Sequence, residues 1–283
     1  IKATIGAVSA CGTALVAYLL GTVPENGAVL FMWRANVSQP LQLPPVMGHR
    51  GAASLAPENT LAGLAAAAQA GCHWVELDVM LARDGVPVLH HDPTLKRTAG
   101  ITRKVSALSA ARLADIDVGR SFDATYAGEK VPDLATALER LQALGLRPNL
   151  EMKPTRGREA ALAEAVGAAL DAIWPATGPR PMVSSFSRLA LAAARDRAPA
   201  YPRGLIVLRP PRQWARILGE LDCVSLHVSR RHLTLARAEA LANSPYALAV
   251  YTVNEPDEAR LFRRWGAQCI ITDTPQHLHD SPL

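Results

Sequence analysis

From Pro45 onward, short apolar or β-branched runs alternate with Ala- and Leu-rich amphipathic segments. This alternation is typical of a parallel sheet whose strands are joined by helices. The predicted strands are 45–49, 74–80, 86–91, 148–153, 181–186, 204–208, 223–227, 247–253 and 268–272. The predicted helices are 60–71, 133–145, 158–173, 187–196, 211–220, 233–242 and 255–265. The pattern and the length of this region predict an α/β fold, a TIM (β/α)8 barrel, for residues 45–283.

Two features predict that the barrel is irregular. Nine strands are one more than an eightfold barrel needs, and only a few residues around Asp84-Gly85 separate the second strand from the third. A parallel crossover needs a longer connection, so we expect a hairpin or a distorted connection there. Residues 93–131 are polar, irregular and long for a connection. We expect them to form a small inserted subdomain that caps the site.

Residues 1–44 precede the barrel pattern as an N-terminal extension. Residues 3–20 carry no charge and just reach the length of a membrane-span candidate. Two interpretations stay open: an anchor or uncleaved signal, or upstream sequence before Met32 that has no role in the chemistry. We expect a cytoplasmic protein, with membrane tethering through residues 3–20 as the alternative.

The composition argues against several classes of protein. A chain that is 49% hydrophobic and 19% charged is not of the disordered class. The net charge is +5, but the basic residues are scattered, so we expect a mild attraction for anionic small molecules and no nucleic-acid partner. The four cysteines lie far apart without a CxxC pair, and we expect free thiols.

Ionisable side chains gather at the carboxyl ends of four predicted strands, where a barrel of this kind has its active site. They are His49 and Arg50 after the first strand, Glu76 and Asp78 on the second, His91 after the third, and Glu151 and Lys153 on the fourth. Because alternate strand residues share a face, Glu76 and Asp78 project the same way. Two carboxylates on a buried strand are costly unless a cation sits between them.

The residue types at these strand ends indicate phosphodiester chemistry. Three carboxylates without a nearby cysteine suit one hard divalent cation, Mg²⁺ or Ca²⁺. Arg50 and Lys153 suit a phosphate, through a forked guanidinium and a point charge respectively. His49 and His91 supply a general base and a general acid. Together these groups predict metal-dependent cleavage of a phosphodiester.

Some neighbouring residues have more than one interpretation. Only one of His90 and His91 can point into the barrel mouth, and the pairing with Asp92 favours His91. Asp273 is expected to cap the segment that follows it. Three further side chains are balanced between barrel packing and substrate contact: Ser184, Ser185 and His227.

Seven short motifs occur in a fixed order: HRG, PENT, E-x-D, DG, HD, E-x-K and TVN. Together they resemble the glycerophosphodiester phosphodiesterase family, from Val46 to about Thr274. The carboxyl half, with YPRGLIVL, CVSLH, VYTVNEP and RRWGAQCIITD, is similar to the bacterial cytoplasmic branch that accompanies glycerol-3-phosphate uptake. The family often has Trp where this chain has Tyr251, which bears on stacking against the substrate.

The resemblance implies a TIM barrel, one divalent cation and hydrolysis of glycerophosphodiesters to glycerol-3-phosphate and an alcohol, a reaction of lipid and glycerol metabolism. It also implies an inserted subdomain after the HD pair and a structural role for Glu58. By motif, the implied site residues are His49 and His91 as catalytic residues, Glu76, Asp78 and Glu151 as metal ligands, and Arg50 and Lys153 as phosphate contacts.

Three alternatives to this function remain. A cyclising phospholipase of related architecture would use the same groups and end at a cyclic phosphate. A non-catalytic binder of phosphodiesters, tethered to a membrane by residues 1–31, would not need paired histidines. A barrel that isomerises phosphorylated sugars would not need this density of metal ligands.

Overall fold

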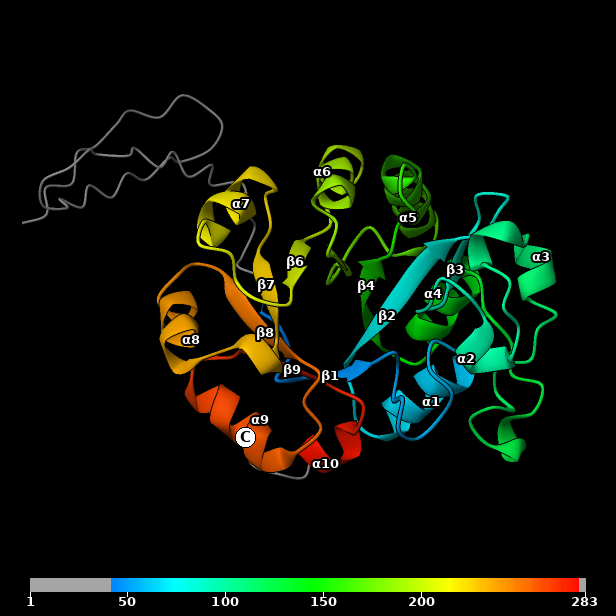
Figure 1. Ribbon diagram of the computed structural model, residues 1–283, viewed down its shortest axis with the longest axis horizontal. Coiled ribbons are helices and arrows are strands. Elements are labelled where there is room, and N and C mark those ends of the chain that lie inside the picture. The colour runs from blue at the N-terminus through cyan, green and yellow to red at the C-terminus, as the bar shows by residue number, and fades with distance from the viewer. Residues whose placement is uncertain (1–41, 280–283) are drawn as a thin grey trace, which may run out of the picture. The chain divides into compact units, whose positions relative to one another are not determined.

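The computed structural model describes residues 42–279. Its sheet holds β1 (Val46–His49), β2 (Trp74–Leu81), β3 (Pro87–Leu89), β4 (Arg147–Met152), β5 (Met182–Ser185), β6 (Arg203–Val207), β7 (Ser225–Ser229), β8 (Ala247–Tyr251) and β9 (Cys269–Thr272). The strand order is β1-β9-β8-β7-β6-β5-β4-β2-β3, and β1 also pairs with β2. This last pairing closes eight parallel strands into a barrel, so the predicted fold is confirmed (Figure 1).

Helices that follow the strands surround the barrel (Figure 1). They are α1 (Leu61–Gln69), α4 (Leu134–Ala143), α5 (Glu159–Ile173), α6 (Arg188–Arg197), α7 (Trp214–Glu220), α8 (Leu235–Ala242), α9 (Pro256–Arg264) and α10 (Pro275–His279). Side-chain caps fix several of their starts: Asp133 accepts from the backbone N–H of Thr136 at 2.7 Å, and Ser187 accepts from that of Ala190 at 3.2 Å.

The predicted irregularity lies at β3, which pairs with β2 in the antiparallel sense, Val79 opposite Leu89. β2 belongs to the barrel ring, and β3 forms a hairpin with it outside the ring, as predicted. After β3, residues 93–131 contain the short helices α2 (Lys96–Ala99) and α3 (Ala110–Leu113). A separate small apolar cluster joins this segment to β2 and β3: Met80, Ala82, Val88, Leu95, Val105, Leu113, Val118 and Val131.

The barrel interior is apolar at its amino end and polar at its carboxyl end. Side chains early in the strands, among them Met47, Trp74, Met182 and Cys269, pack together as one buried cluster. This cluster fills the amino end of the barrel. The polar side chains lie at the opposite end, where the strands finish.

Two other predictions concern residues outside the barrel site. Among residues 42–279, no helix is long and apolar enough to cross a membrane. The segment 3–20 lies outside the described residues. The cysteines at 72, 223 and 269 are buried free thiols, as expected, and Cys11 again lies outside.

The first strand leaves no room for a side chain at Gly48. An added Cβ would lie 2.1 Å from the carbonyl oxygen of Gly51, because the chain folds back sharply after β1. We expect Gly48→Ala to lower the free energy of unfolding by about 1–3 kcal/mol, measured by urea denaturation. Gly219→Ala on α7 is the control: its Cβ would be 3.7 Å from the nearest atom, so stability should hold or rise. Equal stability of the two variants would contradict this account of the turn.

Candidate active site

Three carboxylates meet at the carboxyl ends of β2 and β4. The strand register places Asp78 opposite Glu151, and Glu76 shares the face of Asp78. One carboxylate oxygen from each residue lies within 4.8 Å of the others. Glu76 and Asp78 are almost fully buried, and Oε1 of Glu76 has no hydrogen-bond partner.

The crowding of these acids changes their ionisation. Burial raises the pKa of Glu76 well above its usual range, and the nearby Asp78 and Glu151 raise it further. Burial and Asp78 likewise raise the pKa of Glu151 to about 7. Asp78 differs, because Lys153 and Arg50 outweigh the effect of its burial and hold its pKa below the usual range. A buried cluster of three carboxyl groups, two of which resist ionisation without a further positive charge, fits a divalent cation.

Two basic side chains flank Asp78. The Lys153 ammonium is 3.2 Å from Oδ1 of Asp78 and 3.4 Å from Oε1 of Glu151. On the other side, Arg50 Nε is 3.3 Å from Oδ2 of Asp78, and its NH1 group donates to Glu58 at 3.0 Å. The positive charges therefore stand directly beside the candidate metal ligands, where a phosphate bound to the cation would meet them.

The imidazole of His49 is oriented by Asp273. Nδ1 of His49 is 2.6 Å from Oδ1 of Asp273, and a carboxylate only accepts, so Nδ1 carries the proton. Nε2 is then free and lies 3.8 Å from Oε2 of Glu76. Asn254 donates to the other oxygen of Asp273 at 2.9 Å. The predicted capping role of Asp273 is wrong, because its carboxylate holds His49 instead.

His91 has the same arrangement with a different carboxylate. Its Nδ1 donates to Oδ1 of Asp92 at 2.6 Å, and Nε of Arg97 donates to Oδ2 at 2.7 Å. Although partial burial opposes it, these two hydrogen bonds lower the pKa of Asp92 to about 2. His90 is buried and contacts Thr98 of the inserted segment. The two neighbouring histidines thus project to different places, as strand geometry predicts.

Arg97 also reaches across the mouth to the loop after β1. Its two terminal nitrogens contact the carboxylate oxygens of Glu58 at 2.6 and 2.7 Å, and Glu58 in turn accepts from Arg50. One continuous chain of contacts therefore runs from His91 through Asp92, Arg97 and Glu58 to Arg50.

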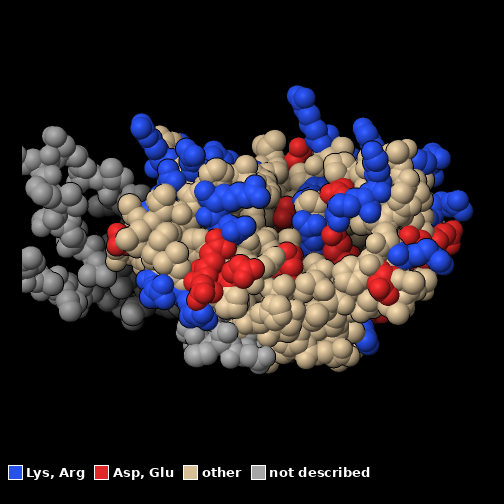
Figure 2. Space-filling view, turned by 60° about the horizontal axis from the view of Figure 1, so that its bottom comes forward, with Lys and Arg blue, Asp and Glu red and all other residues tan. Residues whose placement is uncertain are grey.

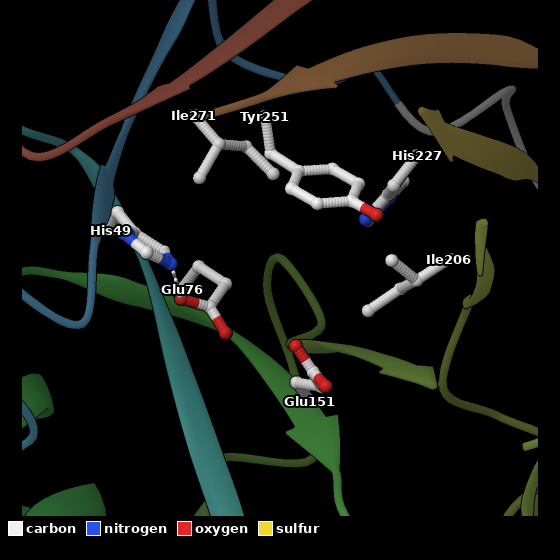
Figure 3. A pocket seen from close by; sticks show the side chains of 7 residues that line it. All are labelled: His49, Glu76, Glu151, Ile206, His227, Tyr251 and Ile271. Carbon is white, nitrogen blue, oxygen red and sulfur yellow. Dashed lines mark ion pairs between the residues drawn. The ribbon is translucent and has the colours of Figure 1, made fainter. Parts of the chain in front are cut away.

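A small cavity opens beside the carboxylates. In Figure 3, His49, Glu76 and Glu151 lie on one side and Ile206, Tyr251 and His227 on the other, with Ile271 between them. The Tyr251 hydroxyl donates to the carbonyl of Val207 at 3.0 Å, which fixes its ring at the cavity wall.

The serines and His227 divide between packing and the cavity. The Ser185 hydroxyl donates to the carbonyl of Met152 at 2.6 Å and accepts from the backbone N–H of Ser187, so this side chain has a structural role. Ser184 is buried without a hydrogen-bond partner and does not line the cavity. His227 lines the cavity, with its Nε2 within 3.0 Å of Ser225 Oγ.

The Glycerophosphoryl diester phosphodiesterase family matches residues 49–277, most of the chain and all of the site described above. The chain belongs to this family. It is therefore a hydrolase, and its structure contains the barrel and the cluster of three carboxylates described above.

Relatives of this phosphodiesterase cover nearly its whole barrel. A glycerophosphodiester phosphodiesterase of Caldanaerobacter subterraneus subsp. tengcongensis is 27% identical over 237 residues, 82% of this chain and 95% of the relative. An Oleispira antarctica phosphodiesterase, solved in complex with the product sn-glycerol-3-phosphate, is 34% identical. It superposes with a TM-score of 0.82, covering 84% of this chain and 96% of its own. A glycerophosphodiester phosphodiesterase from Agrobacterium tumefaciens, 24% identical with a TM-score of 0.70, shares the fold.

The sequence alone did not identify two residues of this candidate site: Asp273, which was expected to cap the next segment, and Arg97. Asp273 lies 224 positions after the histidine that it holds. Asp273 directly follows the predicted strand 268–272. A position at the carboxyl end of a strand is the criterion that selected the other acids, so it could have selected Asp273 as well. Arg97 lies in an irregular segment where no periodicity indicates the direction of a side chain.

Arg97 offers a direct test of the network across the mouth of this phosphodiesterase. We expect Arg97→Ala to lower kcat/KM for a glycerophosphodiester on the order of tenfold to a hundredfold. Arg97 holds Asp92 and Glu58, the carboxylates that contact His91 and Arg50, so its loss leaves both side chains less well positioned. Arg97→Lys should recover part of the loss, since an ammonium can hold one carboxylate. Arg112→Ala is the control, because this exposed residue of the same segment forms an ion pair with Asp115 and with no other side chain among residues 42–279. Equal activities of Arg97→Ala and Arg112→Ala would refute the claim that Arg97 positions His91 and Arg50.

Proposed function

We propose that the chain hydrolyses glycerophosphodiesters to glycerol-3-phosphate and an alcohol, using one divalent cation, Mg²⁺ or Ca²⁺, held by Glu76, Asp78 and Glu151. The observation that carries the proposal is the convergence of three carboxylates within 4.8 Å, with the basic side chains of Arg50 and Lys153 beside Asp78 and with His49 Nε2 3.8 Å from Glu76. Family membership and the product seen in the Oleispira antarctica neighbour support this choice of substrate.

The charged groups divide the work of binding. When bound, the cation withdraws charge from the phosphoryl oxygens. Arg50 and Lys153 bind the same phosphate from either side of Asp78 and stabilise the charge that builds up during cleavage. Their ion pairs with Asp78 hold both side chains in place before the substrate arrives.

The two histidines move the protons. Each keeps Nδ1–H on a carboxylate, Asp273 for His49 and Asp92 for His91, so each presents Nε2 to the reaction. One Nε2 takes a proton from the nucleophile, which is either water or the substrate's own 2-hydroxyl, and the other gives a proton to the departing alkoxide. With the 2-hydroxyl, a cyclic phosphate forms first and water then opens it. The carboxylates stabilise whichever imidazole is charged at that moment.

The reaction product separates this function from a cyclising phosphodiesterase. Phosphorus NMR of a glycerophosphocholine digest should show glycerol-3-phosphate as the accumulating species. A cyclic phosphate that persists to the end of the reaction would favour the cyclising alternative. Unchanged substrate, with Mg²⁺ and Ca²⁺ each supplied, would overturn the proposal.

The ionisation of Glu151 predicts how pH and metal affect stability together. In metal-free protein the pKa of Glu151 in the folded state is about 7, above the ordinary 4.5. The stability that its neutral carboxyl contributes to the fold is therefore present at low pH and is lost as pH rises through 7. Asp78 has a lowered pKa and stays ionised in this window. We therefore expect chelated protein to lose thermal stability between pH 5 and pH 8, and Mg²⁺ to restore more of it at the higher pH.

The control for this prediction is Glu151→Gln, which carries no titrating carboxyl at this position. Its melting temperature in chelator should depend less on pH than that of the parent, and Mg²⁺ should shift it less. A parent whose Mg²⁺ shift is the same at pH 5.5 and pH 8 would rule out proton release at this cluster.

A further inference from the structure

The large apolar side chains that are exposed within residues 42–279 all lie toward the carboxyl ends of the strands or in the inserted segment. They are Leu55, Val86, Phe122, Phe186, Leu189, Leu208 and Leu235. Except for Phe122 in the inserted segment, each belongs to a loop that follows a strand or to the first turn of the next helix. Single exposed apolar residues are ordinary, but a one-sided gathering marks an interaction surface.

Four of these side chains belong to three neighbouring connections, residues 186–189, 208–214 and 229–235, which we call the β5–β7 rim. Strands β5, β6 and β7 are adjacent in the barrel, so the connections that follow them adjoin as well. The four side chains are substantially exposed: Phe186 47%, Leu189 69%, Leu208 59% and Leu235 46%.

The β5–β7 rim is also strongly basic. Its three segments, FSRL, LRPPRQW and SRRHLTL, contain arginines and no Asp or Glu. The arginines are Arg188, Arg209, Arg212, Arg230 and Arg231. Arg230 pairs with Glu258, whereas the other four have no acidic partner in the part of the chain that the structure describes. Figure 2 shows Lys and Arg side chains projecting around a hollow in which acidic atoms are visible.

The apolar part of the rim continues into the cavity of the active site. The Phe186 ring packs edge-on against Tyr251, with 6.2 Å between ring centroids. Tyr251 and Ile206 line the cavity itself. A surface that covers the rim would therefore lie directly over the entrance to the carboxylates.

We propose that the β5–β7 rim docks on the surface of an anionic phospholipid membrane. Leucine and phenylalanine side chains suit the boundary between headgroups and acyl chains, and unpaired arginines suit lipid phosphates. A second copy of the chain is a poor occupant, because a symmetric contact would place the arginine clusters of both copies together. Docking needs no hydrolysis, so this proposal stands beyond the proposed function.

Vesicle flotation of the full chain tests the proposal. Vesicles of phosphatidylcholine with phosphatidylglycerol should retain the parent better than phosphatidylcholine alone. The double variant Arg209→Gln with Arg212→Gln should reduce partitioning to the anionic vesicles about thirtyfold. Leu189→Ser with Leu208→Ser should reduce it on the order of tenfold. Residues 1–41 are the same in every variant, so their contribution cancels in each comparison.

The matched control is Arg140→Gln with Arg264→Gln, at the ends of α4 and α9 away from the rim. It has the same net charge as the arginine rim variant and should partition like the parent. Equal losses in both arginine pairs, or no preference of the parent for anionic vesicles, would overturn the proposal. So would a sedimentation shift from dimer to monomer in the rim variants, which would assign the surface to a second copy. Hydrolysis of glycerophosphocholine without vesicles is measured in parallel, so a failure of the enzymatic function is seen separately.

Discussion

Replacing Glu151 with Gln is expected to lower kcat/KM for glycerophosphocholine on the order of a thousandfold, since the charge stabilisation that a bound cation supplies amounts to several kcal/mol. Glu76→Gln should have an effect of similar size. Both carboxylates belong to the cluster within 4.8 Å, and neither can be replaced there by a neutral amide without weakening the cation site. Initial rates at saturating Mg²⁺ or Ca²⁺ give the measurement.

The same variants should remain folded. Burial and neighbouring acids raise the pKa of both Glu76 and Glu151, so a neutral amide relieves repulsion in the metal-free protein. The melting temperature in chelator should therefore stay level or rise. Glu239→Gln, at an exposed position on α8, is the control for the substitution itself. Near-parent activity of Glu151→Gln at ordinary metal concentrations would remove this residue from the site.

Substitution of either oriented histidine should give the second large loss. We expect His49→Ala and His91→Ala each to lower kcat by about 10²- to 10⁴-fold, because each removes one proton transfer. Asp273→Asn should cause a smaller loss than His49→Ala, since it leaves the imidazole present but no longer fixes its Nδ1 proton. Steady-state rates across pH 5–9 would show one limb of the profile altered in each histidine variant.

His73→Ala is the matched control for the histidine variants, because this exposed residue precedes β2 at the amino end of the barrel. It should keep the activity of the parent. If His91→Ala keeps full activity on glycerophosphocholine, the proposed division of proton transfer is wrong.

Local sequence patterns predicted much of the fold because they reflect short-range geometry. Alternation along β2 placed Glu76 and Asp78 on one face, and the short Asp84-Gly85 link predicted the hairpin of β3. Periodicity was less accurate at helix starts. The helix predicted at 211–220 begins at Trp214, after a segment that contains Pro210 and Pro211.

Contacts between distant segments could not be predicted from these patterns. The pairing of Asp78 with Glu151 depends on strand register, and that of His49 with Asp273 depends on closure of the barrel between β1 and β9. Arg97 reaches Glu58 only because the inserted segment folds against the loop after β1. Motif resemblance named the acids and histidines, and its HD pair supplied Asp92, but it did not supply Asp273, the carboxylate that orients His49.

The most direct test of the account is release of glycerol-3-phosphate from glycerophosphocholine before and after metal removal. We predict that chelator abolishes the activity of the parent, that Mg²⁺ or Ca²⁺ restores it, and that neither cation restores Glu151→Gln at the same concentration. Full activity of the parent after exhaustive chelation and dialysis would contradict a metal-dependent site at Glu76, Asp78 and Glu151.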